Sequence, residues 1–274
     1  MDIRLICMDL DGTALRNDHK TVSPRLLSVL EAAHRQGIAI VPVTGRQYKL
    51  LPSFLQEHPV WERYVVLCNG AQIRELGSGM LLHALSVPKA ALEMLLELAQ
   101  RYDLPIEFSV DSTLYLTAHS LHLQQPHPEL TFHRDTILAS SGCIVDSLVP
   151  LCGVGVEKVN LMCISQDIRE AVLRDLETIP VSAVWASTTS MEITHTDANK
   201  GSGVKKLCGL LDIPMEAVMA LGDSGNDLTM LQSAGLGIAM GNAPDFVKAA
   251  ADVVTETNEN DGAATAIERY ALNQ

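Results

Sequence analysis

Short apolar segments alternate with amphipathic segments through the first third of the chain. Ile3–Asp9 and Ile38–Val43 are apolar runs that each end in a polar turn, as buried parallel strands do. Between them, Ser23-Pro24 supplies a helix N-cap with a proline in the first turn, and Gly37 marks the helix end. A second helical stretch then leads to a third apolar run, Tyr64–Cys68. The order β-α-β-α-β predicts a parallel sheet with right-handed crossovers.

The pattern changes between about residues 82 and 190. Pro88–Tyr102 reads as an amphipathic helix, and Ile106–Val110 and Thr113–Thr117 read as a hairpin that turns at Asp111-Ser112. A further strand is predicted at Val156–Ile164, and a further helix at Asp167–Glu177. Hairpins mixed with helices indicate a separate α+β unit rather than more of the parallel sheet.

The βα alternation returns towards the C-terminus. Lys200–Leu211 is predicted to be a helix, Ala217–Leu221 and Gly237–Met240 to be strands, and a last helix is expected after Gly262. We therefore predict an α/β protein with a Rossmann-like parallel-sheet core. The core is formed by residues 1–82 and 190–274, and residues 83–189 form an inserted α+β domain.

Composition narrows the functions that this fold could carry. The formal charge of −13 over 274 residues argues against binding to nucleic acid or to an anionic membrane, because both need a basic surface. Six scattered cysteines without a CxxC pair, no evident signal peptide and no long apolar span predict a cytoplasmic protein with free thiols. An anionic substrate stays possible, since a bound divalent cation can reverse the local charge of a pocket.

Four polar segments follow predicted strands or open helices: Asp9–Thr13, Thr44–Arg46, Lys200 and Gly222–Asp227. The carboxyl ends of parallel strands meet at one edge of a sheet, so these segments are expected to lie together. Carboxylates gathered in one cleft repel one another and call for a hard cation such as Mg²⁺, whose coordination is usually completed by a substrate phosphate. Each segment alone could be only a turn or a helix cap, but their combination predicts a phosphoryl-transfer site.

Taken in order, Asp9-Leu10-Asp11-Gly12-Thr13, Thr44, Lys200 and Gly222-Asp223-Ser224-Gly225-Asn226-Asp227 resemble the four motifs of the haloacid dehalogenase (HAD) superfamily. The size and position of the inserted domain resemble subclass IIB, the Cof-type sugar-phosphate phosphatases with an α+β cap. Asn69-Gly70-Ala71, after the third strand, also resembles that subfamily. The resemblance implies a Mg²⁺-dependent phosphatase that hydrolyses small phosphate monoesters through an aspartyl-phosphate.

The same resemblance implies individual roles. Asp9 would be the nucleophile, Asp11 the general acid and base, and Thr44 and Lys200 would hold phosphoryl oxygens. The metal would be bound by Asp9, Asp11 (through its backbone carbonyl), Asp223 and Asp227. The substrate phosphate would be contacted by Asp9, Leu10, Asp11, Gly12, Thr44, Gly45, Lys200 and Asn226.

Several alternatives stay open at this point. A phosphomannomutase-like phosphotransferase would use the same core, and a non-catalytic phosphate-ligand sensor or a scaffold would keep the fold without turnover. His119, His122, His127 and His133 gather in the inserted domain, but loop histidines beside prolines are more often exposed than metal ligands. The expected partner is a small phosphorylated metabolite, a sugar phosphate or a phosphorylated cofactor, and the expected state is a monomer or small homo-oligomer.

Overall fold

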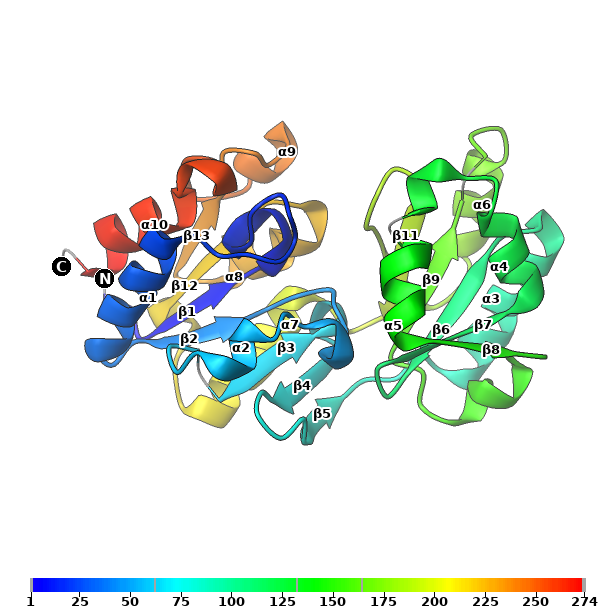
Figure 1. The fold of residues 1–274 in the computed structure, drawn as a ribbon, viewed down its shortest axis with the longest axis horizontal. Coiled ribbons are helices and arrows are strands. Elements are labelled where there is room, and N and C mark those ends of the chain that lie inside the picture. Colours follow the sequence, from blue (N-terminus) through cyan, green and yellow to red (C-terminus); the bar gives the residue numbers. More distant parts are fainter. Residues whose placement is uncertain (1, 62, 132, 164, 273–274) are drawn as a thin grey trace. The chain divides into compact units, whose positions relative to one another are not determined.

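The computed structural model describes residues 2–61, 63–131, 133–163 and 165–272, with side chains at all of these except residues 56, 57, 136, 137 and 140. The chain divides into two compact units (Figure 1). The first unit contains the residues up to Gly45, then Pro52–His83, and the residues from Asn199 onward. The second unit contains Arg46–Leu51 and Ala84–Ala198.

A parallel sheet of five strands, in the order β14-β13-β12-β1-β2, forms the centre of the first unit. Leu5 of β1 pairs with Val218 of β12 on one side and with Ala39 of β2 on the other. Non-consecutive neighbours of this kind require crossover connections, as the sequence predicted. The strands of the sheet are β1 (Leu5–Met8), β2 (Ala39–Pro42), β12 (Val218–Gly222), β13 (Leu236–Ala239) and β14 (Val253–Val254).

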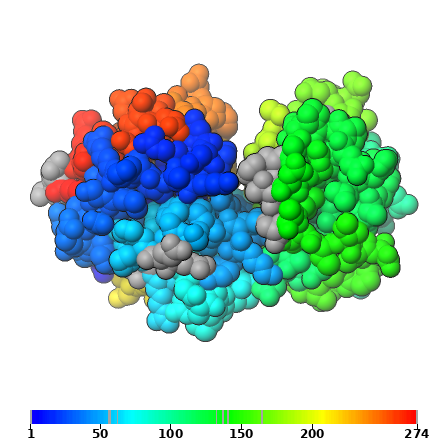
Figure 2. All heavy atoms as spheres, in the orientation of Figure 1, coloured from blue at the N-terminus to red at the C-terminus, as the bar shows by residue number. Residues whose placement is uncertain are grey.

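Helices cover both faces of this sheet. Leu5 and Cys7 of β1 share a buried apolar cluster with residues of α7 and α8, while the alternating residues Ile6 and Met8 point to the opposite face. On that opposite face α1 and α10 lie side by side (Figure 1). Figure 2 shows the N-terminal segment, in blue, against the C-terminal segment, in orange and red. The helices of this unit are α1 (Pro24–Arg35), α2 (Phe54–Glu57), α7 (Lys200–Leu211), α8 (Leu228–Ser233), α9 (Asp245–Lys248) and α10 (Gly262–Ile267).

The two long helices of the first unit begin at the caps that the sequence provides. The Ser23 side chain accepts a hydrogen bond from the Leu26 backbone amide and so caps α1. Asn199 caps α7 in the same way through the amide of Ser202, and the Ser202 hydroxyl lies 3.0 Å from the Asn199 backbone nitrogen. The second cap fixes the start of α7 and therefore the position of Lys200, the first residue of that helix.

The third predicted strand is only loosely joined to the parallel sheet. β3 (Tyr64–Leu67) meets the end of β2 at the single parallel bridge Val43–Val66, and it also belongs to a three-stranded sheet with β4 (Gln72–Glu75) and β5 (Leu81–Ala84). β3 and β4 run antiparallel. β4 and β5 were not predicted from the sequence, because their polar residues do not form an apolar run.

The second unit contains a mixed sheet of six strands in the order β10-β11-β9-β6-β7-β8. The predicted hairpin is present: Val110 pairs with Thr113, and the two turn residues Asp111 and Ser112 have φ of 45° and 61°. Glu157 accepts hydrogen bonds from the backbone amides of both turn residues. The strands are β6 (Ile106–Val110), β7 (Thr113–Thr117), β8 (Gly142–Val145), β9 (Lys158–Met162), β10 (Val181–Trp185) and β11 (Ser190–His195).

Two helices share the apolar core on one face of this second sheet, α3 (Lys89–Tyr102) and α6 (Arg169–Leu176). The shorter helices of the unit are α4 (Ala118–Gln124) and α5 (Ala139–Ser141). Ile164, which the sequence analysis placed at the end of a strand, lies outside the described residues.

A parallel core sheet with a separate mixed-sheet insertion confirms the predicted fold class. One strand lies on the other side of the boundary expected at residue 190. β11 pairs with both β9 and β10, and the second unit extends to Ala198. The apolar alternation of β11 does not reveal which sheet it joins, since pairing between distant strands is set by the tertiary structure. In the described part of the chain, no helix is long and apolar enough to cross a membrane.

Candidate active site

Asp9 lies immediately after β1 and is 4% exposed. Its backbone amide donates to the Leu221 carbonyl of the neighbouring strand β12, at 3.0 Å. The chain then makes a wide turn in which Gly12 has φ of +75°. A side chain at this position would overlap the Asp223 carboxylate, so both the conformation and the close approach require glycine. Thr13 donates to the same carboxylate, at 3.2 Å from Oδ1.

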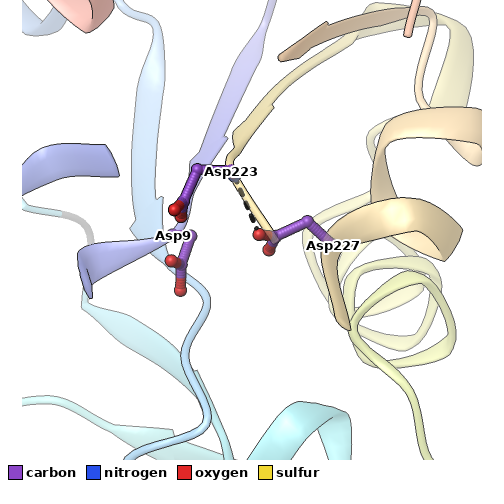
Figure 3. A group of neighbouring side chains, drawn as sticks. All are labelled: Asp9, Asp223 and Asp227. Carbon is purple, nitrogen blue, oxygen red and sulfur yellow. Dashed lines mark hydrogen bonds between the residues drawn. The ribbon is translucent and has the colours of Figure 1, made fainter. Parts of the chain in front are cut away.

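Three carboxylates converge at the carboxyl ends of β1 and β12 (Figure 3). One potential ligand oxygen from each of Asp9, Asp223 and Asp227 lies within 4.8 Å of the others. Asp227 is oriented by its own loop, because its Oδ2 accepts hydrogen bonds from the backbone amides of Asp223 and Ser224, each at 3.0 Å. These three aspartates are among the side chains expected to lie together because they follow the carboxyl ends of parallel strands.

Lys200 enters the cluster from the first turn of α7. Its Nζ lies 2.7 Å from Asp9 Oδ1 and 2.6 Å from Asp227 Oδ1, and the whole side chain is buried. A single buried ammonium group therefore bridges two of the three carboxylates. When all four side chains are ionised, the three carboxylates and the one ammonium group leave the cluster with a net charge of −2.

The pKa values in the cluster reflect this excess. Burial raises the pKa of Asp9 well above its usual range, against the opposing effect of Lys200. Burial, followed by the charge of Asp227, raises the pKa of Asp223 to about 6. For Lys200, burial alone would lower the pKa, but the carboxylates of Asp227 and Asp9 outweigh it and raise the pKa. Buried carboxylates in excess over cations are suited to a hard divalent ion with oxygen ligands.

Thr44 and Gly45 follow β2 at the same edge of the sheet. Thr44 is 1% exposed, its backbone amide donates to Val66 at 2.9 Å, and its carbonyl accepts from Asn69 at 3.1 Å. These bonds hold Thr44 between the ends of β2 and β3. Gly45 ends this segment of the first unit, and the following residues belong to the second unit.

The remaining predicted phosphate contacts lie in two loops. Leu10 is fully buried, so it can offer only its backbone to a ligand. Asn226 is half-buried, donates from Nδ2 to Asn69 Oδ1 at 3.1 Å and accepts at Oδ1 from the Ser224 hydroxyl at 2.6 Å. Its side-chain amide is therefore held in one orientation.

Asp11 differs from the three clustered carboxylates. Its side chain is 37% exposed, and its Oδ1 lies 2.8 Å from Nδ1 of His19. A partly exposed carboxyl group near the cluster can exchange protons with solvent, which the buried carboxylates cannot do as readily. His19 was not identified from the sequence, because the polar loop in which it lies gives no signal that would place it beside Asp11.

A second residue that the sequence analysis missed is Asn242. Its Nδ2 lies 2.9 Å from the Gly12 carbonyl and 3.2 Å from Asp223 Oδ2, so it joins two of the predicted loops. Asn242 follows β13 in a polar turn, Gly241-Asn242. Asn242 could have been predicted as a site residue, because it follows the carboxyl end of a parallel strand as Asp9 and Asp223 do.

The histidines of the second unit do not converge on one another. His119 pairs with Asp103, His127 with Glu129, and His133 with Glu107. Within the described residues, the one group of His, Cys, Asp and Glu side chains arranged to hold a metal is that of Asp9, Asp223 and Asp227.

Comparison with known proteins gives the class of protein. Residues 6–267 match the family described as haloacid dehalogenase-like hydrolase, and the chain belongs to this family. The Bacillus subtilis (strain 168) protein YxeH is 32% identical over 284 residues, which is 98% of each chain. A 5-amino-6-(5-phospho-D-ribitylamino)uracil phosphatase of the same organism, YcsE, is 29% identical over 99% of this chain and 97% of its own.

Two further comparisons narrow the class. The pyridoxal phosphate phosphatase YbhA of Escherichia coli (strain K12) is 27% identical over 99% of this chain and 100% of its own. Among solved structures, the subclass IIB sugar phosphatase BT4131 superposes with a TM-score of 0.83 and 23% identity, over 98% and 99% of the two chains.

Together with the family match, these likenesses show a HAD-type phosphatase, a phosphoric monoester hydrolase that acts on small phosphate esters. Family membership and the acidic cluster together imply a metal site.

Proposed function

We propose that the protein hydrolyses a sugar phosphate or a phosphorylated cofactor with Mg²⁺, through an aspartyl-phosphate on Asp9. The observation that carries the proposal is the convergence of Asp9, Asp223, Asp227 and Lys200 at the carboxyl edge of the sheet. The donor set fits Mg²⁺, because carboxylate and carbonyl oxygens are the ligands that this ion prefers. We expect Asp9, Asp223, Asp227 and the Asp11 carbonyl to hold it, and when bound it would supply positive charge for the phosphoryl oxygens.

In the first half of the reaction an Asp9 carboxylate oxygen attacks phosphorus. The bond between phosphorus and the ester oxygen breaks, and that oxygen takes a proton from the Asp11 carboxyl group. Lys200 stays beside Asp9 throughout and offers hydrogen bonds to the transferring group in place of those it now makes to the carboxylates. Thr44 and Asn226 are proposed to donate to the other phosphoryl oxygens.

In the second half, the Asp11 carboxylate takes a proton from water, and the water oxygen attacks phosphorus. The bond from phosphorus to Asp9 breaks, inorganic phosphate leaves, and both aspartates return to their starting states. Asp11 suits the two-way proton transfer because it is partly exposed and is not held in the buried ion-pair cluster.

The test is phosphate release from a panel of hexose and pentose phosphates, pyridoxal phosphate, flavin mononucleotide and p-nitrophenyl phosphate, with and without Mg²⁺. Release that requires both Mg²⁺ and Asp9, with Asp9→Asn as the matched control, is the expected result. Isomerisation of a sugar phosphate without net phosphate release would favour the phosphotransferase instead. Binding without turnover on every member of the panel would favour a sensor.

A further inference from the structure

Three consecutive residues after β3 have a left-handed backbone. Cys68, Asn69 and Gly70 have φ of 50°, 53° and 93°, and all three are buried. For the two residues other than glycine, this conformation costs free energy, and it persists where the surroundings hold it in place. The turn is therefore a site at which the local structure is imposed by its contacts.

Those contacts reach three of the predicted catalytic segments. The Asn69 backbone amide donates to the carbonyl of Thr44, at 3.1 Å. The Asn69 side chain accepts at Oδ1 from Asn226 Nδ2, at 3.1 Å. Gly70 lies against the backbone of Asn199, the residue before Lys200, so closely that a methyl group on Gly70 would overlap the Asn199 carbonyl. One turn, which carries no proposed catalytic group, thus touches the segments of Thr44, Asn226 and Lys200.

The contact with Asn226 determines what that side chain can offer a ligand. Asn226 Oδ1 accepts from Ser224, and one hydrogen of Nδ2 is donated to Asn69. Nδ2 carries a second hydrogen, whose direction is fixed once the first has its acceptor. Without the Asn69 carbonyl oxygen, the amide of Asn226 could rotate, and a donor would no longer point in one direction.

We propose that Asn69 is a positioning residue for the substrate phosphate, which it orients through the side-chain amide of Asn226. This inference rests on the proposed function in one respect, namely that Asn226 donates to a phosphoryl oxygen. The left-handed backbone alone does not account for Asn69, because glycine adopts this conformation at lower cost. What asparagine adds at this position is a buried acceptor aimed at Asn226.

The experiment is a calorimetric titration of the full chain with inorganic phosphate in the presence of Mg²⁺. Asn69→Gly keeps the backbone conformation accessible and removes only the side chain. We expect phosphate to bind about tenfold more weakly, the loss of one well-oriented hydrogen bond to a charged group. Asn226→Ala is expected to weaken binding by a similar factor. The double variant should lose no more than Asn226→Ala alone, because Asn69 acts through Asn226.

Asp212→Gly is the matched control, since Asp212 also has a left-handed backbone (φ 54°) but is exposed at the end of α7. It should bind phosphate as the unmodified protein does. Unchanged binding by Asn69→Gly, or losses that multiply to about a hundredfold in the double variant, would overturn the inference. So would a lack of phosphate binding by the unmodified protein.

Phosphate binding requires no turnover, so this titration is independent of the phosphatase assay. A protein that binds phosphate with the expected pattern but releases none from any ester would contradict the proposed function and leave the role of Asn69 supported. Thermal melting separates positioning from folding: Gly70→Ala, which disturbs the packing on Asn199, should lower the melting temperature, whereas Asn69→Gly should leave it nearly unchanged.

Discussion

Each unit of the molecule contains a buried carboxylate, and the pKa values of the two are shifted in opposite directions. Asp9 in the first unit shares one lysine with Asp227 and lies beside Asp223, and its pKa is raised. Glu107 in the second unit is fully buried, and its two oxygens accept hydrogen bonds from His133, Asn160 and Gln124, all between 2.9 and 3.0 Å. Burial alone would raise the pKa of Glu107, yet the bonds from these partners, chiefly from His133, outweigh it and lower the pKa.

The difference shows how to separate a functional charge from a structural one. Both carboxylate oxygens of Glu107 already accept hydrogen bonds from protein donors, so they are not available to a ligand. Glu107 therefore has a structural role. The Asp9 cluster has more carboxylates than cations, so it is stabilised by whatever positive charge enters it. Burial is common to both sites, and the number and sign of the partners distinguish them.

The largest effect among the variants that test this difference is expected from Asp9→Asn. Turnover should fall by about a thousandfold or more, because the amide cannot serve as the nucleophile. Without Mg²⁺, however, the variant should be at least as stable as the unmodified protein, since it removes one charge from a cluster with excess negative charge and leaves Lys200 paired with Asp227. Phosphate release and thermal melting in EDTA measure the two effects. A clear loss of stability would show that Asp9 is a structural ion-pair partner like Glu107.

Glu107→Gln is the matching change in the second unit. It should destabilise that unit by about 2–3 kcal/mol, because a buried network loses a charged acceptor that His133, Asn160 and Gln124 share. Urea unfolding followed by Trp185 fluorescence in a Trp61→Phe background reports on the second unit alone. Glu93→Gln, on the exposed side of α3, is the control and should leave the unfolding midpoint unchanged. An unshifted midpoint for Glu107→Gln would mean that its buried pairing contributes no net stability.

The same two variants should differ in the direction of their pH dependence. Asp9 has a raised pKa in the folded protein, so its cost to stability appears as the pH rises from the unfolded value of about 4 towards the folded value. Glu107 has a lowered pKa, so its contribution is complete above an unfolded value of about 4 and is lost as the pH falls through the folded value.

Melting curves between pH 3 and pH 8 in EDTA test both signs. The advantage of Asp9→Asn over the unmodified protein should grow as the pH rises, and the deficit of Glu107→Gln should shrink as the pH falls. The melting temperature of each variant minus that of the unmodified protein should therefore rise with pH for Asp9→Asn and fall with pH for Glu107→Gln. If both differences rose, or both fell, the two carboxylates would not differ in the way the structure indicates.

The two units also differ in how far the sequence predicted them. Asp9, Lys200, Asp223 and Asp227 could be grouped because parallel strands deliver their carboxyl ends to one edge, so that local patterns imply a distant meeting. No comparable rule places Glu107 beside His133, since their contact depends on how the short helical segment that begins at His133 packs against β6.

β11 was not predicted as a strand, and even a correct strand prediction would not have shown that it pairs with β9, since alternation does not identify the partner strand. His19 stands beside Asp11 through a loop with no periodic signal at all.

The smallest expected effect comes from a carboxylate on the surface. Glu268 accepts from Arg25 at 2.7 Å, and the two side chains are 40% and 45% exposed. The pair joins the segment after α10 to α1, and its short distance resembles that of the buried pairs. Water and salt nevertheless screen it, and holding both side chains still costs entropy, so Glu268→Gln should shift the melting temperature by no more than about 1–2 °C. Melting at low and high salt is the measurement, and a larger shift that persists at high salt would show that distance, rather than burial and the balance of charge, sets the contribution of a carboxylate in this protein.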